Sequence, residues 1–364
     1  MGAPRRMPAE WEAHAATWLA WPHQAKDWPG KFGAVPWVFV EMARALTEGE
    51  RVRLLVSSTR LRKDAESALT RSGVDLGRVD FVPSETDRSW TRDFVPTFAV
   101  ETGRARPRRP APFGARGKDG LVAVKWRFNG WARYANHKKD ERTGAQIGAL
   151  LGVPSVEPAA NVGGRKRRVV LEGGAIDVDG EGTLLTTREC LLDGAQARNP
   201  ELGQQGIEAV LAAELGIERV LWLDRGIAGD DTGGHVDDFA RFVAPGVVVL
   251  GEEKNRRDPN YRVLESARER LTGARDARGR KIRVVRLPMP APVVFDGQRL
   301  PASYANFYIG TSSVLVPTFN DAADRTALGV LAELFPDRRI VGIHAIDLVL
   351  GLGTIHCSTQ QEPL

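Results

Sequence analysis

The chain has 364 residues, with 51 lysines and arginines against 46 aspartates and glutamates, which gives a formal net charge of +5 at pH 7. Hydrophobic residues make up 42% of the chain and charged residues 27%, as in ordinary globular proteins, so a chain disordered throughout is excluded. A charge of +5 spread over this length is a weak field, and it gives no basis for expecting a nucleic-acid partner.

The cysteine count excludes further classes of protein. The two cysteines, Cys190 and Cys357, are too few for a disulfide framework or a four-cysteine zinc module.

The first residues, Met1–Glu10, contain two arginines with no apolar segment behind them, and no run of about 18 apolar residues occurs in the chain. We therefore expect no membrane partner and a cytoplasmic location.

Short apolar segments between glycine-rich turns predict strands, and apolar residues at helical spacing predict helices. In chain order, the expected strands are Val52–Ser57, Val169–Leu171, Thr183–Thr187, Val220–Leu223, Val247–Leu250, Ile282–Leu287, Val314–Pro317 and Ile340–Ile343. The expected helices are Val38–Glu48, Leu61–Ser72, Gly206–Leu215, Asn260–Leu271 and Ala323–Leu334. Strands and helices are interspersed and no second domain boundary is evident, so the pattern predicts a single α/β domain over residues 1–364.

Two arginine-rich segments interrupt this pattern. Arg104–Lys118 mixes arginine, proline and glycine without apolar periodicity, which predicts an exposed, extended insertion. Arg165–Arg168 precedes the apolar Val169–Leu171, and we interpret it as the solvated approach to a strand.

Three segments repeat one arrangement, in which an apolar run meets paired or near-paired glycines flanked by polar, reactive side chains. They are 169–180 (VVLEGGAIDVDG), 229–243 (GDDTGGHVDDFARFV) and 347–361 (DLVLGLGTIHCSTQQ). Glycines at a strand end permit close backbone approach, so side chains beside them can converge on one small site. The repetition indicates an enzyme built from similar structural units.

The two cysteines stand in different surroundings. Cys357 is flanked by polar residues in HCSTQQ, which is a poor core strand, whereas Cys190 precedes two leucines. A free cysteine is most often a small buried hydrophobe, and that interpretation suits Cys190. Cys357 is the candidate nucleophile, provided that its surroundings or a cationic substrate favour the thiolate.

A histidine and three carboxylates complete the candidate site. If Gly234–Asp238 is extended, His235 and Asp237 point to the same face, as a general acid/base and an electrostatic anchor would. Asp93 lies in an aromatic setting beside Trp90, and Glu172 follows an apolar run, where a carboxylate needs a partner. His356 alternates away from Cys357 and is better explained as a hydrogen-bonded structural residue.

Together these residues suggest a cation site with a nucleophile, and two carboxylates suit the planar, donor-only guanidinium group. The residue types alone leave alternatives open. Papain-like hydrolysis, or a zinc site made of His235, Asp237 and Cys357, is compatible with the same side chains.

Longer sequence motifs narrow the choice among these enzyme classes. The segments MPAEWEAHAATWLAWP, WTRDFVPTF, FNGWARY, LEGGAIDVDGEGTLLTTRECLL, WLDRGIAGDDTGGHVDDFARF, LPASYANFYI and GLGTIHCSTQQEP occur in this order along nearly the whole chain. In these motifs the chain resembles the agmatine deiminase family, which includes the bacterial-type peptidylarginine deiminases and belongs to the guanidine-modifying enzymes. The resemblance implies a propeller of five ββαβ-type blades around a central site.

The resemblance also implies roles. Cys357 becomes the nucleophile, His235 the general acid/base, Asp93 and Asp237 the guanidinium anchors, and Glu172 a residue that positions His235 and substrate. Trp90 is expected to cover the substrate's methylene chain. Two positions depart from the commonest family pattern: Leu352, where many members have glycine, and Glu362, where many have glutamine.

The implied reaction hydrolyses agmatine to N-carbamoylputrescine and ammonia, a step of polyamine biosynthesis, without a metal or organic cofactor. The alternatives are free arginine or peptidylarginine as substrate, amidino transfer to an amine, a zinc hydrolase, and a guanidine binder without catalysis. Arg127, Arg133 and Arg241 are the candidates for binding an arginine carboxylate. The oligomeric state stays open, with a homo-oligomer as one alternative.

Overall fold

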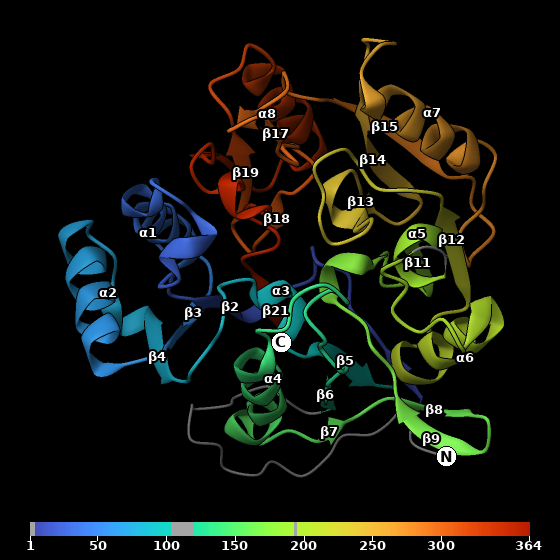
Figure 1. Ribbon diagram of the computed structural model, residues 1–364, viewed down its shortest axis with the longest axis horizontal. Helices are drawn as coiled ribbons and strands as arrows, with labels where there is room; N and C mark the ends of the chain where they lie inside the picture. The colour runs from blue at the N-terminus through green and yellow to red at the C-terminus, as the bar shows by residue number, and fades with distance from the viewer. Residues whose placement is uncertain (1–3, 103–119, 193–194) are drawn as a thin grey trace.

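The computed structural model describes residues 4–102, 120–192 and 195–364 (Figure 1). The segment Arg104–Lys118, expected to be an exposed insertion, lies outside the described residues. The fold is mixed α/β, as the sequence predicted. Among the described residues, no helix combines the length and the apolar character that crossing a membrane would require.

Five sheets of three or four strands form the framework. In strand order they are β1-β5-β6-β7, β10-β11-β12, β13-β14-β15, β18-β19-β20 and β21-β2-β3-β4. Figure 1 shows these sheets following one another around the centre of the molecule, near which β21 and α3 (Thr91–Phe94) lie. The strands are β1 Arg5–Arg6, β2 His14–Ala20, β3 Arg51–Val56, β4 Val79–Pro83, β5 Thr97–Glu101, β6 Leu121–Val124, β7 Ser155–Val156, β10 Asp177–Val178, β11 Thr183–Thr187, β12 Arg219–Leu223, β13 Ala240–Ala244, β14 Val247–Glu252, β15 Arg283–Pro288, β18 Tyr308–Ile309, β19 Ser313–Thr318, β20 Arg339–His344 and β21 Gln360–Pro363.

Each of these five sheets contains the same three-strand unit. A first strand pairs antiparallel with a second, and the second pairs parallel with a third: β5-β6-β7, β10-β11-β12, β13-β14-β15, β18-β19-β20 and β21-β2-β3. The last unit joins the two ends of the chain, because C-terminal β21 pairs with N-terminal β2 and sets Gln360 opposite Trp18.

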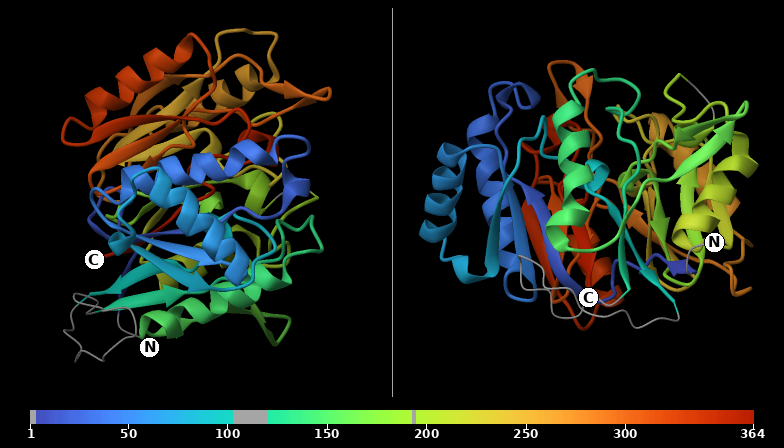
Figure 2. Two further views of the ribbon diagram at one scale, coloured as in Figure 1. Left: turned by 90° about the vertical axis from the view of Figure 1, so that its left-hand side faces the viewer. Right: turned by 90° about the horizontal axis from the view of Figure 1, so that it is seen from below.

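The helices lie outside the sheets, and Figure 1 and the left view of Figure 2 place α8 and α4 at opposite edges of the molecule. The helices of more than one or two turns are α1 Val35–Leu46, α2 Thr59–Arg71, α4 Lys138–Leu151, α6 Gly203–Leu215, α7 Pro259–Leu271 and α8 Ala323–Leu334. In α1 the residues Val35, Phe39, Met42 and Leu46 recur at helical spacing and are all buried. Such a stripe stabilises a helix by packing it against the sheets, here β3 and β20.

All five expected helices are present, with boundaries that differ by at most a few residues. The sequence missed α4, whose first turns are rich in charge, and the short α3 and α5 (Arg188–Leu191). Seven of the eight expected strands are present, whereas Val169–Leu171 forms only an isolated bridge, between Val170 and Arg127.

The basic segment Arg165–Arg168 was also misread. It is itself a strand, β9, which pairs antiparallel with β8 (Ala159–Val162) in a hairpin turned by Gly163 and Gly164. A two-stranded ribbon with exposed faces tolerates charged side chains, so the absence of apolar residues did not exclude a strand here.

Candidate active site

The five predicted site residues come from short turns that immediately precede the first strand of a three-strand unit. Asp93 lies in the one-turn helix α3 before β5, and Glu172 precedes the 3-10 turn η4 (Gly173–Ala175) before β10. His235 immediately precedes the 3-10 turn η5 (Val236–Asp238), which contains Asp237 and lies before β13, and Cys357 precedes β21. The fold therefore brings together side chains that are far apart in the sequence.

The extended conformation expected for Gly234–Asp238 is wrong. Gly233 and Gly234 have positive φ angles of 82° and 101°, and the chain then forms η5. The carboxylate of Asp230 stabilises this bend, since Oδ2 accepts hydrogen bonds from the backbone N–H of Gly234 at 2.7 Å and of His235 at 3.1 Å. His235 and Asp237 nevertheless face each other, with Nδ1 and Oδ1 4.0 Å apart.

Asp93 is held from two sides. Its Oδ1 accepts a hydrogen bond from the backbone N–H of Gly174 at 3.0 Å, and its Oδ2 accepts one from Nε1 of Trp131 at 2.9 Å. Burial raises the pKa of Asp93 to about 6, with the charges of Asp237 and Glu172 acting in the same direction and His235 opposing them. Asp93 is thus an oriented carboxylate that a cation would help to ionise.

His235 lies among three carboxylates. Its Nδ1 is 3.9 Å from Oδ1 of Asp93 and its Nε2 is 3.6 Å from Oε2 of Glu172. Burial acts to lower the pKa of His235, but the charge of Asp93 and the contacts with Cys190 and Glu172 outweigh it and raise the pKa well above its usual range. The imidazole is therefore protonated near neutral pH and carries a proton to donate.

Gly174 makes this close grouping possible. A Cβ atom at position 174 would lie 2.5 Å from Nδ1 of His235, 3.0 Å from Oδ1 of Asp93 and 3.1 Å from Oδ2 of Asp237. Any side chain there would displace all three groups, so the second glycine of LEGG is a requirement of the site.

Glu172 is fully buried and paired with Arg198, whose Nε donates to both carboxylate oxygens at 2.9 and 3.0 Å. Arg198 is in turn fixed by the carbonyls of Gln196 and Thr232. Despite burial, the charge of Arg198 and the contact with His235 lower the pKa of Glu172, which keeps a negative charge beside His235.

Cys357 is buried, with Sγ 3.8 Å from Oδ2 of Asp237 and 3.2 Å from Nδ2 of Asn306. Burial raises the pKa of the Cys357 thiol, and the charges of Asp237, Asp238 and Asp93 raise it further, well above the usual range. In the absence of a cation the sulfur is therefore a neutral thiol.

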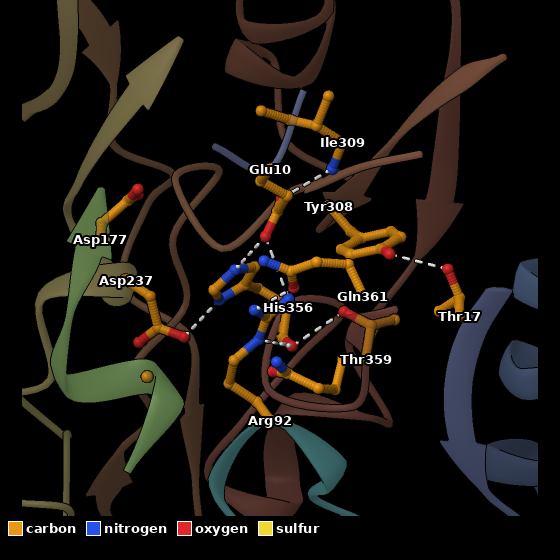
Figure 3. Close-up of polar contacts among 12 residues, drawn as sticks. Glu10, Thr17, Arg92, Asp177, Asp237, Tyr308, Ile309, His356, Thr359 and Gln361 are labelled. Atoms are coloured by element: carbon orange, nitrogen blue, oxygen red, sulfur yellow. Dashed lines mark hydrogen bonds and ion pairs between the residues drawn. The ribbon is translucent and has the colours of Figure 1, made fainter. Parts of the chain in front are cut away.

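His356 holds Asp237 in place through one of its two carboxylate oxygens (Figure 3). Nδ1 of His356 is 2.6 Å from Oδ2 of Asp237, and Nε2 is 2.8 Å from Oε2 of Glu10. Glu10 also accepts hydrogen bonds from Arg92 at 3.0 Å and Arg241 at 2.8 Å. His356 is a hydrogen-bonded structural residue, as its alternation with Cys357 predicted.

A pocket of about 450 Å³ opens onto this group. Cys357, Asp93 and Trp90 line it, together with Trp131, Tyr134 and Asp231, whereas Glu172, His235 and Asp237 are buried beside it and do not line it. Trp90 packs against Trp28 with ring centroids 5.6 Å apart. The pocket size suits a small organic molecule.

Cys190 is fully buried in an apolar cluster with Leu191 and Leu211, as its sequence context predicted. Its thiol nevertheless lies near the site, because the ligand atoms of Glu172, Cys190 and His235 are all within 4.8 Å of one another. Asp237, Asp238 and Cys357 form a second such group. Neither group is the His235, Asp237 and Cys357 set considered for zinc.

Both departures from the family pattern have a structural context. Leu352 lines the pocket with a φ of 68°, in the left-handed region that favours glycine. Glu362 is fully buried, and Arg53 donates to it at 2.7 and 3.1 Å, so this ion pair accounts for a charged residue at that position.

Sequence reasoning missed Trp131, Arg198, Asn306 and Glu10. Trp131 and Asn306 lie inside the motifs FNGWARY and LPASYANFYI, and Glu10 in MPAEWEAH, so the resemblance pointed to these segments without singling out a side chain. Arg198 lies outside the motifs, and no pattern in the sequence indicates that it pairs with Glu172.

Comparisons with known proteins agree with these motifs. A profile of the Porphyromonas-type peptidyl-arginine deiminases matches residues 6–363. An agmatine deiminase of Stutzerimonas stutzeri is 35% identical over 98% of this chain and 95% of its own, and one of Pseudomonas aeruginosa is 34% identical over the same shares.

Solved structures agree as well. The agmatine deiminase of Enterococcus faecalis superimposes with a TM-score of 0.86 at 30% identity, covering 100% of this chain and 98% of that one. A cysteine-to-serine variant of the C. jejuni agmatine deiminase with substrate bound superimposes with a TM-score of 0.82 at 26% identity, covering 100% and 97%. The chain therefore belongs to the Porphyromonas-type peptidyl-arginine deiminase family, as its motifs predicted, and its full-length relatives include agmatine deiminases.

Proposed function

We propose that this protein is an agmatine deiminase, which hydrolyses agmatine to N-carbamoylputrescine and ammonia through a covalent intermediate on Cys357. The observation that carries the proposal is the buried grouping of one thiol, one histidine and two oriented carboxylates at the end of a small pocket. Full-length relatives named agmatine deiminases support the same substrate.

In the first half of the reaction, Asp93 and Asp237 bind the guanidinium group. Oδ1 of Asp237 is buried without a hydrogen-bond partner among the described residues, so it is ready to accept one from the substrate. The bound cation offsets the negative charges that raise the pKa of Cys357, and the thiol loses its proton to solvent. The thiolate attacks the guanidinium carbon, a C–S bond forms, and protonated His235 gives its proton to the departing nitrogen, which leaves as ammonia.

In the second half, neutral His235 removes a proton from water and the resulting hydroxide attacks the thiouronium carbon. The tetrahedral adduct loses its hydroxyl proton to solvent or ammonia, the C–S bond breaks, and the ureido product and thiolate form. Glu172, held by Arg198, positions His235 throughout.

The distal part of the pocket supports agmatine over arginine. Asp231 and Asp296 line it, so acidic side chains are available for the ammonium end of agmatine, and a hydrogen bond from Tyr134 orients Asp231. Trp90 and Trp131 give the methylene chain an apolar wall.

The three arginines considered as partners for the carboxylate of an arginine substrate do not line this pocket. Arg241 is buried on Glu10 and Asp177, Arg127 lines a different hollow, and Arg133 is not among the residues that line the pocket. Arg88 does line it, but it pairs with Asp27 at 3.0 Å and lies over the Tyr134 ring at 4.4 Å. This distribution disfavours free arginine.

The remaining alternatives differ in the acceptor of the amidino group, in the substrate or in the need for a metal. An amidinotransferase would deliver the amidino group to an amine instead of water, a peptidylarginine deiminase would accept a blocked arginine peptide, and a zinc hydrolase would lose activity to a strong chelator. The decisive experiment compares kcat/KM for agmatine, arginine and a blocked arginine peptide, in direct competition, with the ureido product of each followed. Agmatine is expected to exceed the others at least about tenfold, and equal or higher kcat/KM for arginine contradicts the substrate assignment.

For the architecture, the repetition of one three-strand unit supports the five sheets being blades of a five-bladed α/β propeller that forms one domain over residues 1–364. A single cooperative unfolding transition by calorimetry and by fluorescence would agree with one domain. The cytoplasmic location, the homo-oligomer, and the absence of cofactors and of nucleic-acid or membrane partners stay predictions.

A further inference from the structure

The second cysteine lies beside the proposed general acid and has no role in the proposed mechanism. Cys190 is fully buried in α5, where its backbone N–H donates to Oγ1 of Thr187 at 3.1 Å. One ligand atom each of Cys190, Glu172 and His235 lies within 4.8 Å of the other two. Thiolate, imidazole and carboxylate are the side-chain groups that bind zinc in proteins. The fold therefore assembles a zinc-type ligand set beside the substrate pocket.

The two ring nitrogens of His235 face different groups. Nδ1 lies 3.9 Å from Oδ1 of Asp93 and 4.0 Å from Oδ1 of Asp237, the two proposed guanidinium anchors. Nε2 lies 3.6 Å from Oε2 of Glu172 and has no hydrogen-bond partner among the described residues, although His235 is only 1% exposed. A buried polar atom without a partner is uncommon. Here that atom points to the carboxylate with which it would share a metal ion.

Neighbouring side chains support the three ligands from outside. Nε of Arg198 donates to both oxygens of Glu172, which fixes the carboxylate and leaves each oxygen a second lone pair. Asp93 faces the other nitrogen of His235, as carboxylates do behind many histidine ligands of zinc. The ligand atoms of a tetrahedral zinc ion lie roughly 3.3–3.6 Å apart, so shifts of about 1 Å would bring these three side chains to bonding distance.

Binding of Zn²⁺ leaves the charge of this buried site unchanged. One proton leaves the imidazolium of His235 and one leaves the thiol of Cys190 as the two bonds to the metal form, and both protons go to solvent. The two charges of the ion replace the charges of the two protons. The site therefore avoids the cost of burying an additional charge.

The other group of ligand atoms, from Asp237, Asp238 and Cys357, is the weaker candidate. It contains no imidazole, and contacts with His356 and Asn306 already occupy one oxygen of each carboxylate. Structural and catalytic zinc sites are built mainly from nitrogen and sulfur ligands. The comparison favours Cys190 over Cys357 as the cysteine that binds zinc.

We propose that Cys190, His235 and Glu172 form an inhibitory site for Zn²⁺, in which water takes the fourth position. A metal on Nε2 leaves the ring only the Nδ1 proton, and release of that proton gives an imidazolate, so His235 becomes a far weaker acid than an imidazolium. The ring then neither protonates the departing nitrogen nor activates water. The inhibition rests on the proposed role of His235, whereas metal binding does not depend on the proposed function.

The test compares two variants that each lose one thiol, Cys190→Ser and Cys357→Ser, in untagged protein. Co²⁺ is the probe for binding, because a thiolate ligand gives it a strong charge-transfer absorption in the near ultraviolet, and Zn²⁺ is then titrated in to displace it. Wild type and Cys357→Ser should show the band at one Co²⁺ per chain. Cys190→Ser should lose the band and bind Zn²⁺ at least about tenfold more weakly.

Inhibition is measured with agmatine, and the rate of each active protein is normalised to its own metal-free rate. Zn²⁺ should inhibit wild type with a slow onset, because all three ligands are buried, and a chelator should restore the rate. Half-inhibition of Cys190→Ser should need at least about tenfold more Zn²⁺. A zinc hydrolase would respond in the opposite way, since the chelator would remove its activity.

An undiminished cobalt band and zinc affinity in Cys190→Ser overturns the proposal, and so does the absence of the band from wild type. Equal zinc sensitivity of wild type and Cys190→Ser overturns the inhibitory role. If Cys190→Ser does not fold, Cys357→Ser decides alone, because the chain has only two cysteines and the band must then come from Cys190. Failure of the proposed function appears differently, as wild-type protein that shows the cobalt band but does not turn over agmatine.

Discussion

Nδ1 of His356 lies 2.6 Å from Oδ2 of Asp237, which ties a candidate guanidinium anchor to the residue beside the nucleophile. Burial acts to raise the pKa of Asp237, but the hydrogen bond and charge of His356 lower it. The other carboxylate oxygen, Oδ1, has no hydrogen-bond partner among the described residues. Asp237 is therefore ionised and fixed in orientation, and its Oδ1 can accept a hydrogen bond from a ligand.

The stability of this arrangement depends on Glu10, which accepts from His356, Arg92 and Arg241. Glu10→Gln leaves these groups without their carboxylate and should lower the free energy of unfolding by about 3 kcal/mol, measured by urea denaturation. The control Glu12→Gln removes a half-exposed partner of Arg6 and should cost less than about 1 kcal/mol.

The difference in free energy of unfolding between wild type and Glu10→Gln should become smaller as the pH falls. Burial acts to raise the pKa of Glu10, but Arg241, His356 and Arg92 bring it well below its usual range. The stabilisation is therefore present above the unfolded-state pKa and is lost as pH falls toward the folded one. A gap between Glu10→Gln and wild type that widens in acid would contradict this account.

Asp93→Asn and Asp237→Asn should remain folded and lose at least about a thousandfold in kcat/KM. Each change removes a charge opposite the guanidinium and presents N–H donors to a donor-only ligand. The control is Asp179→Asn, a buried carboxylate that accepts from the backbone of Glu181 and Thr183 away from the site and should stay active. Near-normal kcat/KM in either site variant would remove that residue as an anchor.

The raised pKa of Asp93, about 6, predicts the acid limb of the pH profile. The guanidinium needs the ionised carboxylate, so kcat/KM should fall about tenfold per pH unit below 6. Bound substrate favours ionisation, so the acid limb of kcat should lie at lower pH. Steady-state kinetics in overlapping buffers measures the pH profiles of kcat/KM and of kcat. A kcat/KM that stays flat from about pH 5 to 8 is incompatible with the role of Asp93.

Leu352 provides a test of backbone strain at the pocket. Its left-handed φ of 68° costs about 1–2 kcal/mol for a side chain, so Leu352→Gly should change the free energy of unfolding by less than about 1 kcal/mol despite lost packing. Leu348→Gly is the matched comparison, since Leu348 is fully buried at φ −67° and should lose several kcal/mol. Equal losses at both positions would show that strain at Leu352 is negligible.

Chemically distinctive residues were predictable from the sequence. His235 and Glu172 stand beside glycines, Cys357 follows the glycines of GLGTIHC, and the structure brings the three together through tight turns. Asn306 escaped notice because a neutral amide in the apolar segment YANFY carries no signal of chemistry until its distance to the sulfur is known.

Local conformation was less predictable where glycines or pairing decide it. The positive φ of Gly233 and Gly234 turns the chain into η5, which apolar alternation around His235 does not reveal. Arg165–Arg168 forms a strand because β8 supplies its hydrogen-bond partners, although the side chains are charged. Neither feature has a counterpart in hydrophobic periodicity.

The central claim is that Cys357 forms the covalent intermediate, and mass spectrometry of enzyme quenched during turnover tests it most directly. With agmatine labelled by ¹⁵N at both terminal guanidine nitrogens, tryptic peptide 340–364 should carry the amidino-aminobutane group with one label retained, and Cys357→Ser should abolish turnover and adduct. Cys190→Ser should keep most of the activity. An adduct on the peptide that contains Cys190, or turnover by Cys357→Ser, would contradict the assignment.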